Sequence, residues 1–377
     1  MPSKGHRIPY IDGLRAVAVL VVVACHALPR YITIGQSFGV DLFFVISGFC
    51  LSYPSLAKLY ERGSATFDVY RYAGHRIVRI VPPYYIAIAV FLVAAAFLGP
   101  IYNPSSGLDP VFEGVSPLNI ARQALFLDSG TTFLSPSFWS LAVEFRWYLL
   151  FPIALWLWTK SPRAFITVAI AIAIAASGTK AYSTDLFVLP AFLLGIVAAD
   201  IRIRGHRFAL FAAPACVLAF LLAYLKTGPL MSPLWEVAVF LLVVAAGATP
   251  WLGRMLSMKI ITVIGVTSYS IYLMQQPVIE MLQREHVAAW AGIVAAVAAG
   301  FAFWFVAERP FTETAVRTRL VSAFEQVFAK WFPRIDIGRE ISLSAPQGDA
   351  RLGYVSLSPL REGRHDVNRR VSQAEDL

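Results

Sequence analysis

Ten segments of mostly apolar residues divide this chain, and they constrain its fold more than any other feature. A membrane-spanning helix needs about 20 such residues, and a helix satisfies all of its backbone polar groups inside lipid. We therefore predict an all-α integral membrane protein with about ten transmembrane helices. The expected spans are 10–28, 38–56, 80–99, 138–158, 164–179, 185–200, 208–225, 233–249, 259–280 and 288–307.

The composition excludes several other classes of protein. Of the 377 residues, 58% are hydrophobic and only 15% are charged, whereas soluble domains carry about 25% charged residues. An ordinary cytosolic enzyme, a disordered protein and a disulfide-rich secreted scaffold are therefore excluded. The three cysteines, Cys25, Cys50 and Cys216, lie inside apolar stretches and show no Cys-x-x-Cys spacing. We expect neither a disulfide framework nor a metal site.

The positive charges indicate membrane topology. The net charge is +9, but most of the Lys and Arg residues lie in short loops on the side of the N-terminus and in the C-terminal tail. Cytoplasmic loops are enriched in these residues, so we predict that both termini are cytoplasmic. We expect membrane lipids as partners and no nucleic acid. The apolar run after Ile11 is too long for a cleaved signal peptide. With about ten expected spans, we expect a multi-pass protein of the cell inner (plasma) membrane.

The pattern changes after the last span and predicts three regions. Residues 1–310 form the transmembrane domain. In 311–334 apolar residues recur at helical spacing between charged ones, which predicts an amphipathic helix on the inner leaflet. Residues 335–377 are polar, charged and poor in aromatics, which favours a disordered cytoplasmic tail.

The first span carries a polar stripe. Arg15 and His26 are separated by about three helical turns, so they share one face, roughly 16 Å apart along the axis. Asp12 falls close to the same stripe. An ionisable group is costly inside a bilayer and points to a functional site. A hydrogen-bonded structural histidine is the other interpretation of His26.

Two carboxylates in later spans can likewise be either functional or structural. Asp41 begins the second span at a depth similar to that of His26. It can orient the imidazole as the acidic member of a catalytic triad does, or simply favour a helix start. Ser140, Glu144 and Tyr148 share a face of the fourth span by their spacing. Glu144 either lines a cavity or pairs with a neighbouring helix.

Arg76 and Arg79 lie about one turn apart in the expected inner loop before Pro82 and Pro83. Two guanidinium groups at this spacing can hold a phosphate. Anchoring of the loop at the cytoplasmic surface is the other interpretation, and these residues taken alone favour it. The sequence has no nucleophile elbow, P-loop or His-Glu-x-x-His motif, so common hydrolase, ATPase and metal-dependent activities have no support.

These residues together resemble the membrane-bound acyltransferase-3 family over about residues 8–310. That family includes O-acetyltransferases of lipopolysaccharide O-antigen, exopolysaccharide, peptidoglycan and Nod factors, and acyltransferases of macrolide sugars. The matching elements, in chain order, are Tyr10–Ala16, the pair Arg15 and His26, Gly39–Phe49, Arg76 with Arg79, Trp139–Glu144, Ser268–Leu273 and Glu308–Pro310.

The resemblance implies an O-acyltransferase that moves an acyl group, usually acetyl, from acyl-CoA to a sugar hydroxyl. The acceptor would belong to an envelope polysaccharide, a lipid-linked glycan or a secreted glycoside. His26 would be the general base, supported by Asp41. Arg15, Arg76 and Arg79 would handle acetyl-CoA or another acyl-CoA, and Glu144 would line the cavity.

The chain departs from the family pattern at Gln275, where the family often has histidine. An amide forms hydrogen bonds but does not titrate, which increases the expected reliance on His26. A transporter that uses intramembrane Asp, Glu and His residues is the first rival hypothesis, and a catalytically idle scaffold is the second. The sequence leaves open the acceptor, the acyl group, the oligomeric state and the membrane face at which transfer occurs.

Overall fold

The computed structural model describes residues 8–29, 35–101, 111–127, 134–179, 184–225, 231–331 and 340–344, and almost all of them are helical. In chain order the elements are α1 (Pro9–Ala27), α2 (Gly35–Arg62), β1 (Ser64–Asp68), α3 (Val69–Leu98), α4 (Pro117–Ala124), α5 (Phe138–Lys160), α6 (Pro162–Thr179), α7 (Thr184–Arg204), η1 (Arg207–Phe211), α8 (Ala212–Leu225), α9 (Met231–Ala248), α10 (Pro250–Leu256), α11 (Lys259–Val266), α12 (Ser268–Arg284), α13 (Ala289–Phe303), η2 (Trp304–Glu308), α14 (Arg309–Thr312), α15 (Thr314–Trp331) and β2 (Glu340–Ser344).

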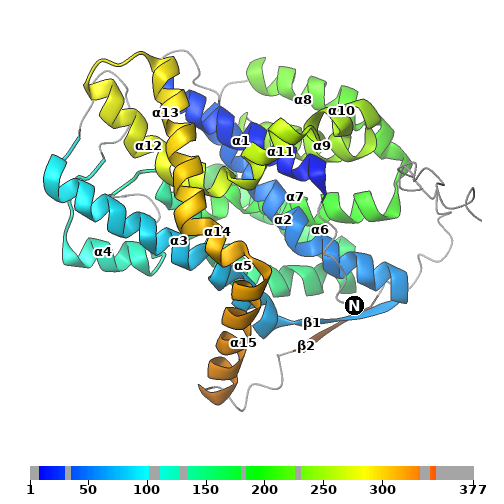
Figure 1. Cartoon of the computed structure of the whole chain (residues 1–377). Helices are drawn as coiled ribbons and strands as arrows, with labels where there is room; N and C mark the ends of the chain where they lie inside the picture. Colours follow the sequence, from blue (N-terminus) through cyan, green and yellow to red (C-terminus); the bar gives the residue numbers. More distant parts are fainter. Residues whose placement is uncertain are drawn as a thin grey trace, which may run out of the picture.

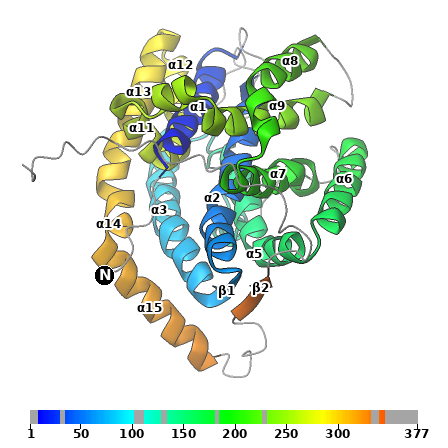
Figure 2. The ribbon, with the colours of Figure 1, turned by 90° about the vertical axis from the view of Figure 1, so that its right-hand side faces the viewer.

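The long helix α2 forms the centre of the bundle and packs against α1, α7 and α9 (Figures 1 and 2). Helices α12 and α13 form a closely packed pair beside α1, and α8 and α9 form another pair. Helix α5 also packs against α2, and α3 contacts α5 and α12. This arrangement brings the first, second, third and fifth helices together with α12, and the candidate site lies between them.

The described helices confirm a multi-pass membrane protein. Six are long and apolar enough to cross a bilayer, or seven if the bent pair Pro233–Ala248 and Pro250–Leu256 counts as one span. Two further apolar helices, Pro162–Ala175 and Ala209–Leu225, are shorter. Each expected span overlaps a helix, but the count of ten and the cytoplasmic position of both termini stay predictions.

Two expected helix boundaries are wrong. The span expected over 259–280 is interrupted at Thr267, between α11 and α12. The helix expected from residue 80 begins at Val69, because Asp68 caps it by accepting a hydrogen bond of 2.9 Å from the backbone N–H of Arg71. Arg76 and Arg79 therefore project from α3 instead of lying in a loop.

Glycines set the close packing of α2 against α7. A Cβ atom added at Gly48 would lie 2.1 Å from the carbonyl oxygen of Phe192, and one at Gly195 would lie 2.2 Å from that of Val45. These atoms belong to backbone and have no room to move aside. Small residues at such crossings let membrane helices approach and gain van der Waals contact.

We predict that Gly195→Ala destabilises the protein by about 1–3 kcal/mol, since it forces α2 and α7 apart. The measurement is thermal unfolding of the detergent-solubilised protein. Gly292→Ala in α13 is the matched control, because a Cβ there meets nothing within 4 Å and alanine favours a helix. Equal melting temperatures for the two variants would contradict the close contact.

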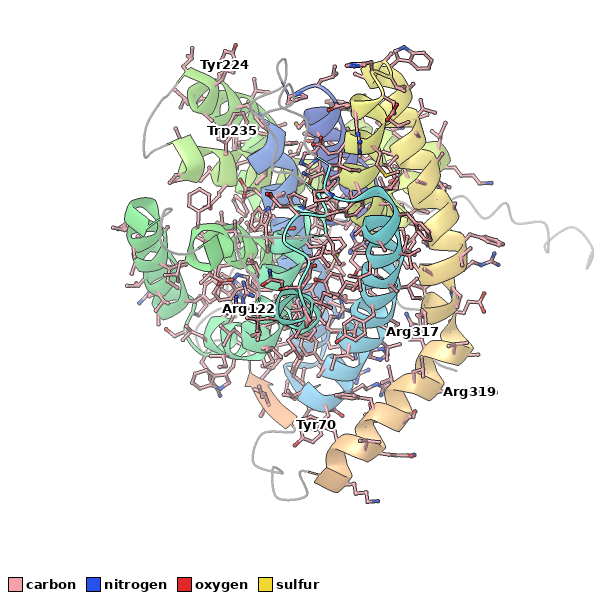
Figure 3. All side chains as sticks on the ribbon, turned by 90° about the vertical axis from the view of Figure 1, so that its left-hand side faces the viewer. Tyr70, Arg122, Tyr224, Trp235, Arg317 and Arg319 are labelled. Carbon is pink, nitrogen blue, oxygen red and sulfur yellow. The ribbon has the colours of Figure 1, made fainter. Side chains whose placement is uncertain are left out.

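The helix expected within 311–334 is present as α15. Part of its apolar face packs on α3, since the Phe328 ring lies 5.0 Å from the Tyr70 ring between centroids. Figure 3 labels Tyr70 on α3 and Arg317 and Arg319 on α15. Val316, Leu320 and Val327 remain exposed. The position of α15 on the inner leaflet stays a prediction.

The expected disordered tail contains a strand, so that prediction is wrong for residues 340–344. Strand β2 pairs antiparallel with β1, and Ser64 lies opposite Ser344. Leu343 of β2 is buried, and the burial of this apolar side chain stabilises the strand. The other positions of 335–377 lie outside the described residues.

Candidate active site

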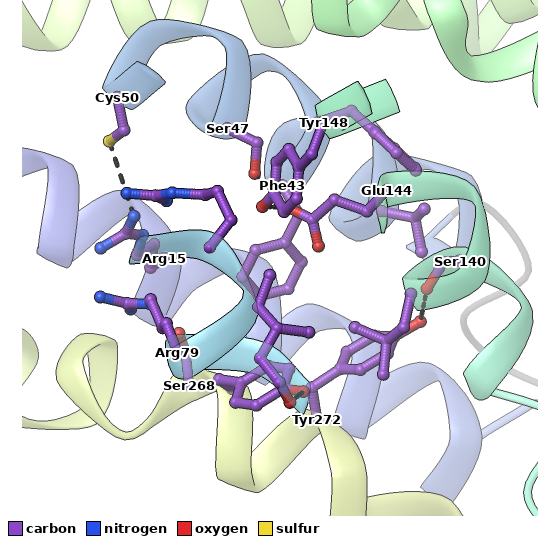
Figure 4. Close-up of a pocket in the computed structure, with 16 residues that line it drawn as sticks. Arg15, Phe43, Ser47, Cys50, Arg79, Ser140, Glu144, Tyr148, Ser268 and Tyr272 are labelled. Atoms are coloured by element: carbon purple, nitrogen blue, oxygen red, sulfur yellow. Dashed lines mark hydrogen bonds between the residues drawn. The ribbon is translucent and has the colours of Figure 1, made fainter. Parts of the chain in front are cut away.

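A cavity of about 800 Å³, including its opening, lies between α1, α2, α3, α5 and α12 (Figure 4). It combines cationic, acidic, hydroxyl and aromatic side chains. The residues that line it are Arg15, Val40, Phe43, Phe44, Ser47, Cys50, Arg76, Arg79, Ile80, Ser140, Leu141, Glu144, Tyr148, Ser268, Tyr269 and Tyr272.

Three arginines make one side of this cavity basic. Arg15 donates hydrogen bonds to Asp12 Oδ1 at 3.3 Å and to Cys50 Sγ at 3.5 Å. The Arg76 guanidinium carbon lies 6.0 Å from the centre of the Tyr148 ring. Within the described residues, Arg76 Nε is buried and has no hydrogen-bond partner. Because a buried unpaired donor is costly, this side of the cavity suits an anionic ligand.

Glu308 balances part of this positive charge, and the sequence analysis did not assign it to the site. It is fully buried in the π-helical turn η2, and its Oε2 accepts a hydrogen bond from Ser270 Oγ at 2.6 Å. It interacts electrostatically with Arg79 and Arg15. Two signals could have found it: a glutamate at the end of the last apolar segment, and its place in a family motif.

The opposite side of the cavity carries Glu144. Its Oε1 accepts hydrogen bonds from the hydroxyls of Ser47 and Tyr148. Ser140, Glu144 and Tyr148 all line the cavity, as the predicted shared face of the helix required. Arg15 and Arg79 lie across the cavity from Glu144 in Figure 4. A polar substrate between the two sides would meet donors on one flank and acceptors on the other.

His26 lies in the last turn of α1 and is not among the residues that line this cavity. Its Nδ1 lies 2.8 Å from Gln275 Oε1. Gln275 Nε2 donates to Ser137 Oγ at 2.8 Å, and the Ser137 carbonyl accepts from the Tyr272 hydroxyl at 3.1 Å. Since Tyr272 lines the cavity, a short chain of residues connects His26 to it.

Asp41 is buried in α2 and interacts electrostatically with Glu236 of α9. The observed partner of His26 Nδ1 is Gln275. The expected pairing of Asp41 with the imidazole therefore stays a prediction. No group of three or more His, Cys, Asp or Glu side chains in the described residues is arranged to hold a metal ion.

These observations define a class: a multi-pass helical membrane protein with a cavity that presents three arginines opposite a glutamate. Residues 8–309 match the model of the acyltransferase-3 family, described as an acyltransferase domain. The chain belongs to this family. No solved structure matches it.

Curated relatives agree with this assignment. The peptidoglycan O-acetyltransferase OatA of Listeria monocytogenes is 26% identical over 315 residues, which cover 73% of this chain and 50% of that protein. The O-acetyltransferase OatA of Staphylococcus aureus is 24% identical over 317 residues, or 74% of this chain and 52% of the relative. The acyltransferase MdmB of Streptomyces mycarofaciens is 31% identical over 170 residues, which cover 41% and 40%. The chain spans about half the length of the two OatA proteins.

Proposed function

We propose that this protein is an inner-membrane O-acyltransferase that moves an acyl group, with acetyl as the first expectation, from acyl-CoA to a sugar hydroxyl. The acceptor belongs to an envelope polysaccharide, a lipid-linked glycan or a secreted glycoside. The observation that carries the proposal is the cavity in which Arg15, Arg76 and Arg79 lie together, in a chain of the acyltransferase-3 family.

The three arginines suit the donor substrate. Coenzyme A carries several phosphates, and guanidinium groups bind phosphate through paired, charge-assisted hydrogen bonds. The buried Nε of Arg76 offers a donor that a phosphate oxygen would satisfy. With its phosphates at Arg76 and Arg79, the donor would extend its pantetheine arm past Arg15 towards His26.

The proposed chemistry assigns His26 the role of general base. The imidazole removes the proton from the sugar hydroxyl while the oxygen attacks the thioester carbonyl. The new C–O bond forms and the C–S bond breaks. The departing thiolate receives a proton, which returns from the imidazolium. Asp41 would support the imidazolium, and Glu144, with Ser47 and Tyr148, would position the reacting groups.

The test compares O-acylation of envelope glycans by mass spectrometry in three strains. One lacks the gene, one is complemented with the wild type, and one carries His26→Ala at a matched membrane level. An acyl mass that disappears on deletion and returns only with the wild type supports the proposal and identifies the acyl group and acceptor. Purified wild-type protein that transfers no radiolabelled acetyl from acetyl-CoA to envelope glycans or secreted glycosides would reject it and favour a transporter.

A further inference from the structure

Helix α12 holds the end of α1 at two points, and both contacts involve glutamine side chains on one face of α12. Gln283 Nε2 donates to the carbonyl oxygens of His26 and Ala27 at 3.3 and 3.0 Å. Gln275, about two turns earlier, contacts the imidazole itself. The contact from Gln283 holds the backbone near His26, and the contact from Gln275 orients the imidazole ring.

The hydrogen bonds beyond Gln275 have a definite direction. Ser137 Oγ donates to Gln276 Oε1 at 2.5 Å, and an amide oxygen only accepts. With its proton committed there, Ser137 Oγ accepts from Gln275 Nε2 at 2.8 Å. This contact turns the Gln275 amide so that its oxygen faces His26.

The His26 ring has two acceptors beside it, the Gln275 side chain and the backbone carbonyl of Val22 one turn earlier in α1, and the orientation of Gln275 favours a proton on Nδ1. Gln275 Oε1 accepts only, and it lies 2.8 Å from His26 Nδ1. A hydrogen bond at this contact requires a proton on Nδ1. A neutral imidazole has one N–H, so its Nε2 then carries the lone pair.

We infer that Gln275, oriented by Ser137 and Gln276, is a positioning residue that holds neutral His26 as the Nδ1–H tautomer and leaves Nε2 as the nitrogen that accepts a proton. The catalytic consequence rests on the proposed function, in which His26 is the base. A glutamine thus performs the orienting task that a carboxylate performs in a catalytic triad. Gln275 is 0% exposed, and its neutral amide adds no charge to this buried site.

The side chains that orient Gln275 are buried, and this burial strengthens the inference. Gln276 and Ser137 are 2% and 3% exposed, so water does not readily replace their hydrogen bonds. The Ser137 carbonyl oxygen lies 3.1 Å from the Tyr272 hydroxyl and 3.3 Å from Ser140 Oγ, and these two hydroxyls are hydrogen-bonded to each other at 2.5 Å. The residue that orients Gln275 is therefore itself held by two side chains that line the cavity.

The direct test is the ¹⁵N NMR spectrum of the detergent-solubilised full-length protein, labelled at histidine, at a pH where His26 is neutral. The His26 signals are assigned by their loss in His26→Gln. We expect a protonated Nδ1 and an unprotonated Nε2 in the wild type. A protonated Nε2, or a mixture of the two tautomers, would overturn the inference.

Three variants separate positioning from packing. In Gln275→Leu we expect mixed tautomers and a kcat lowered about tenfold or more, with the KM for acyl-CoA unchanged. Gln275→Glu keeps an acceptor and should restore the Nδ1–H tautomer. Gln283→Leu is the matched control, since it removes the two hydrogen bonds to the backbone of α1 and should leave the tautomer as in the wild type. A wild-type tautomer in Gln275→Leu would overturn the role of Gln275.

The readouts also separate this inference from the proposed function, because the tautomer is measured without substrate. If Nδ1 is protonated and depends on Gln275 while His26→Gln transfers acyl groups at the wild-type rate, the tautomer assignment holds and the proposed function fails. If His26→Gln is inactive while Nδ1 lacks a proton, the proposed function stands and the inference about Gln275 is wrong.

Discussion

Replacing His26 with glutamine is expected to lower acyl transfer about 10²–10⁴-fold, the contribution that a positioned general base makes. Glutamine keeps polar groups of similar reach but cannot take a proton from the acceptor hydroxyl. The loss should fall on kcat, with little change in the KM for acyl-CoA, because the proposed phosphate contacts lie at Arg76 and Arg79. The measurement is transfer of radiolabelled acetyl by purified protein.

The control for this experiment is His286→Asn. His286 is exposed and has a φ of 57°, a backbone conformation that asparagine tolerates well. This variant should keep wild-type activity. Full activity in His26→Gln, at a matched level of folded protein, would exclude His26 as the base.

Replacing Arg79 with alanine is expected to raise the KM for acyl-CoA about 10- to 100-fold, as the loss of a hydrogen bond between charged groups predicts. Arg79 lies in the cavity beside Arg15 and Arg76, so the variant also weakens the local positive potential. Arg79→Lys should recover only part of the affinity, because an ammonium group keeps the charge but loses the planar paired donors. Steady-state kinetics with varied acyl-CoA concentration measure both effects.

Two comparisons test the specificity of this effect. Arg254→Gln removes an exposed arginine of α10, and it should leave the KM unchanged. S-acetylpantetheine lacks the phosphates of the adenosine end, so wild-type and Arg79→Ala proteins should use it with similar KM values. An equal rise in KM with both donors would show that Arg79 does not bind those phosphates.

Local patterns in the sequence predicted the parts of the site that lie on one helix. The spacing of Ser140, Glu144 and Tyr148 places them on one face, and all three line the cavity. The arginines at 76 and 79 likewise reach one cavity, although the helix that carries them begins earlier than expected. These relationships depend only on helical periodicity, which the sequence displays directly.

Partners between helices were not predictable in the same way. The partner of His26 Nδ1 is Gln275, which is 249 positions away in the chain, and no spacing in the sequence indicated this pair. Glu308 faces the arginines because η2 and α12 bring it next to Ser270. Such pairings depend on how apolar faces pack together, and many different packings are compatible with the same apolar pattern.

The sequence by itself determined that this chain is a helical membrane protein, where most of its helices lie, and which family it resembles, because a bilayer accepts only long apolar segments with satisfied backbones. Tertiary structure alone decided the break at Thr267, the pairing of β1 with β2, and the chain of hydrogen bonds from Gln276 to His26. Each of these depends on contacts between residues distant in sequence, whose favourable energy exists only once the helices have packed.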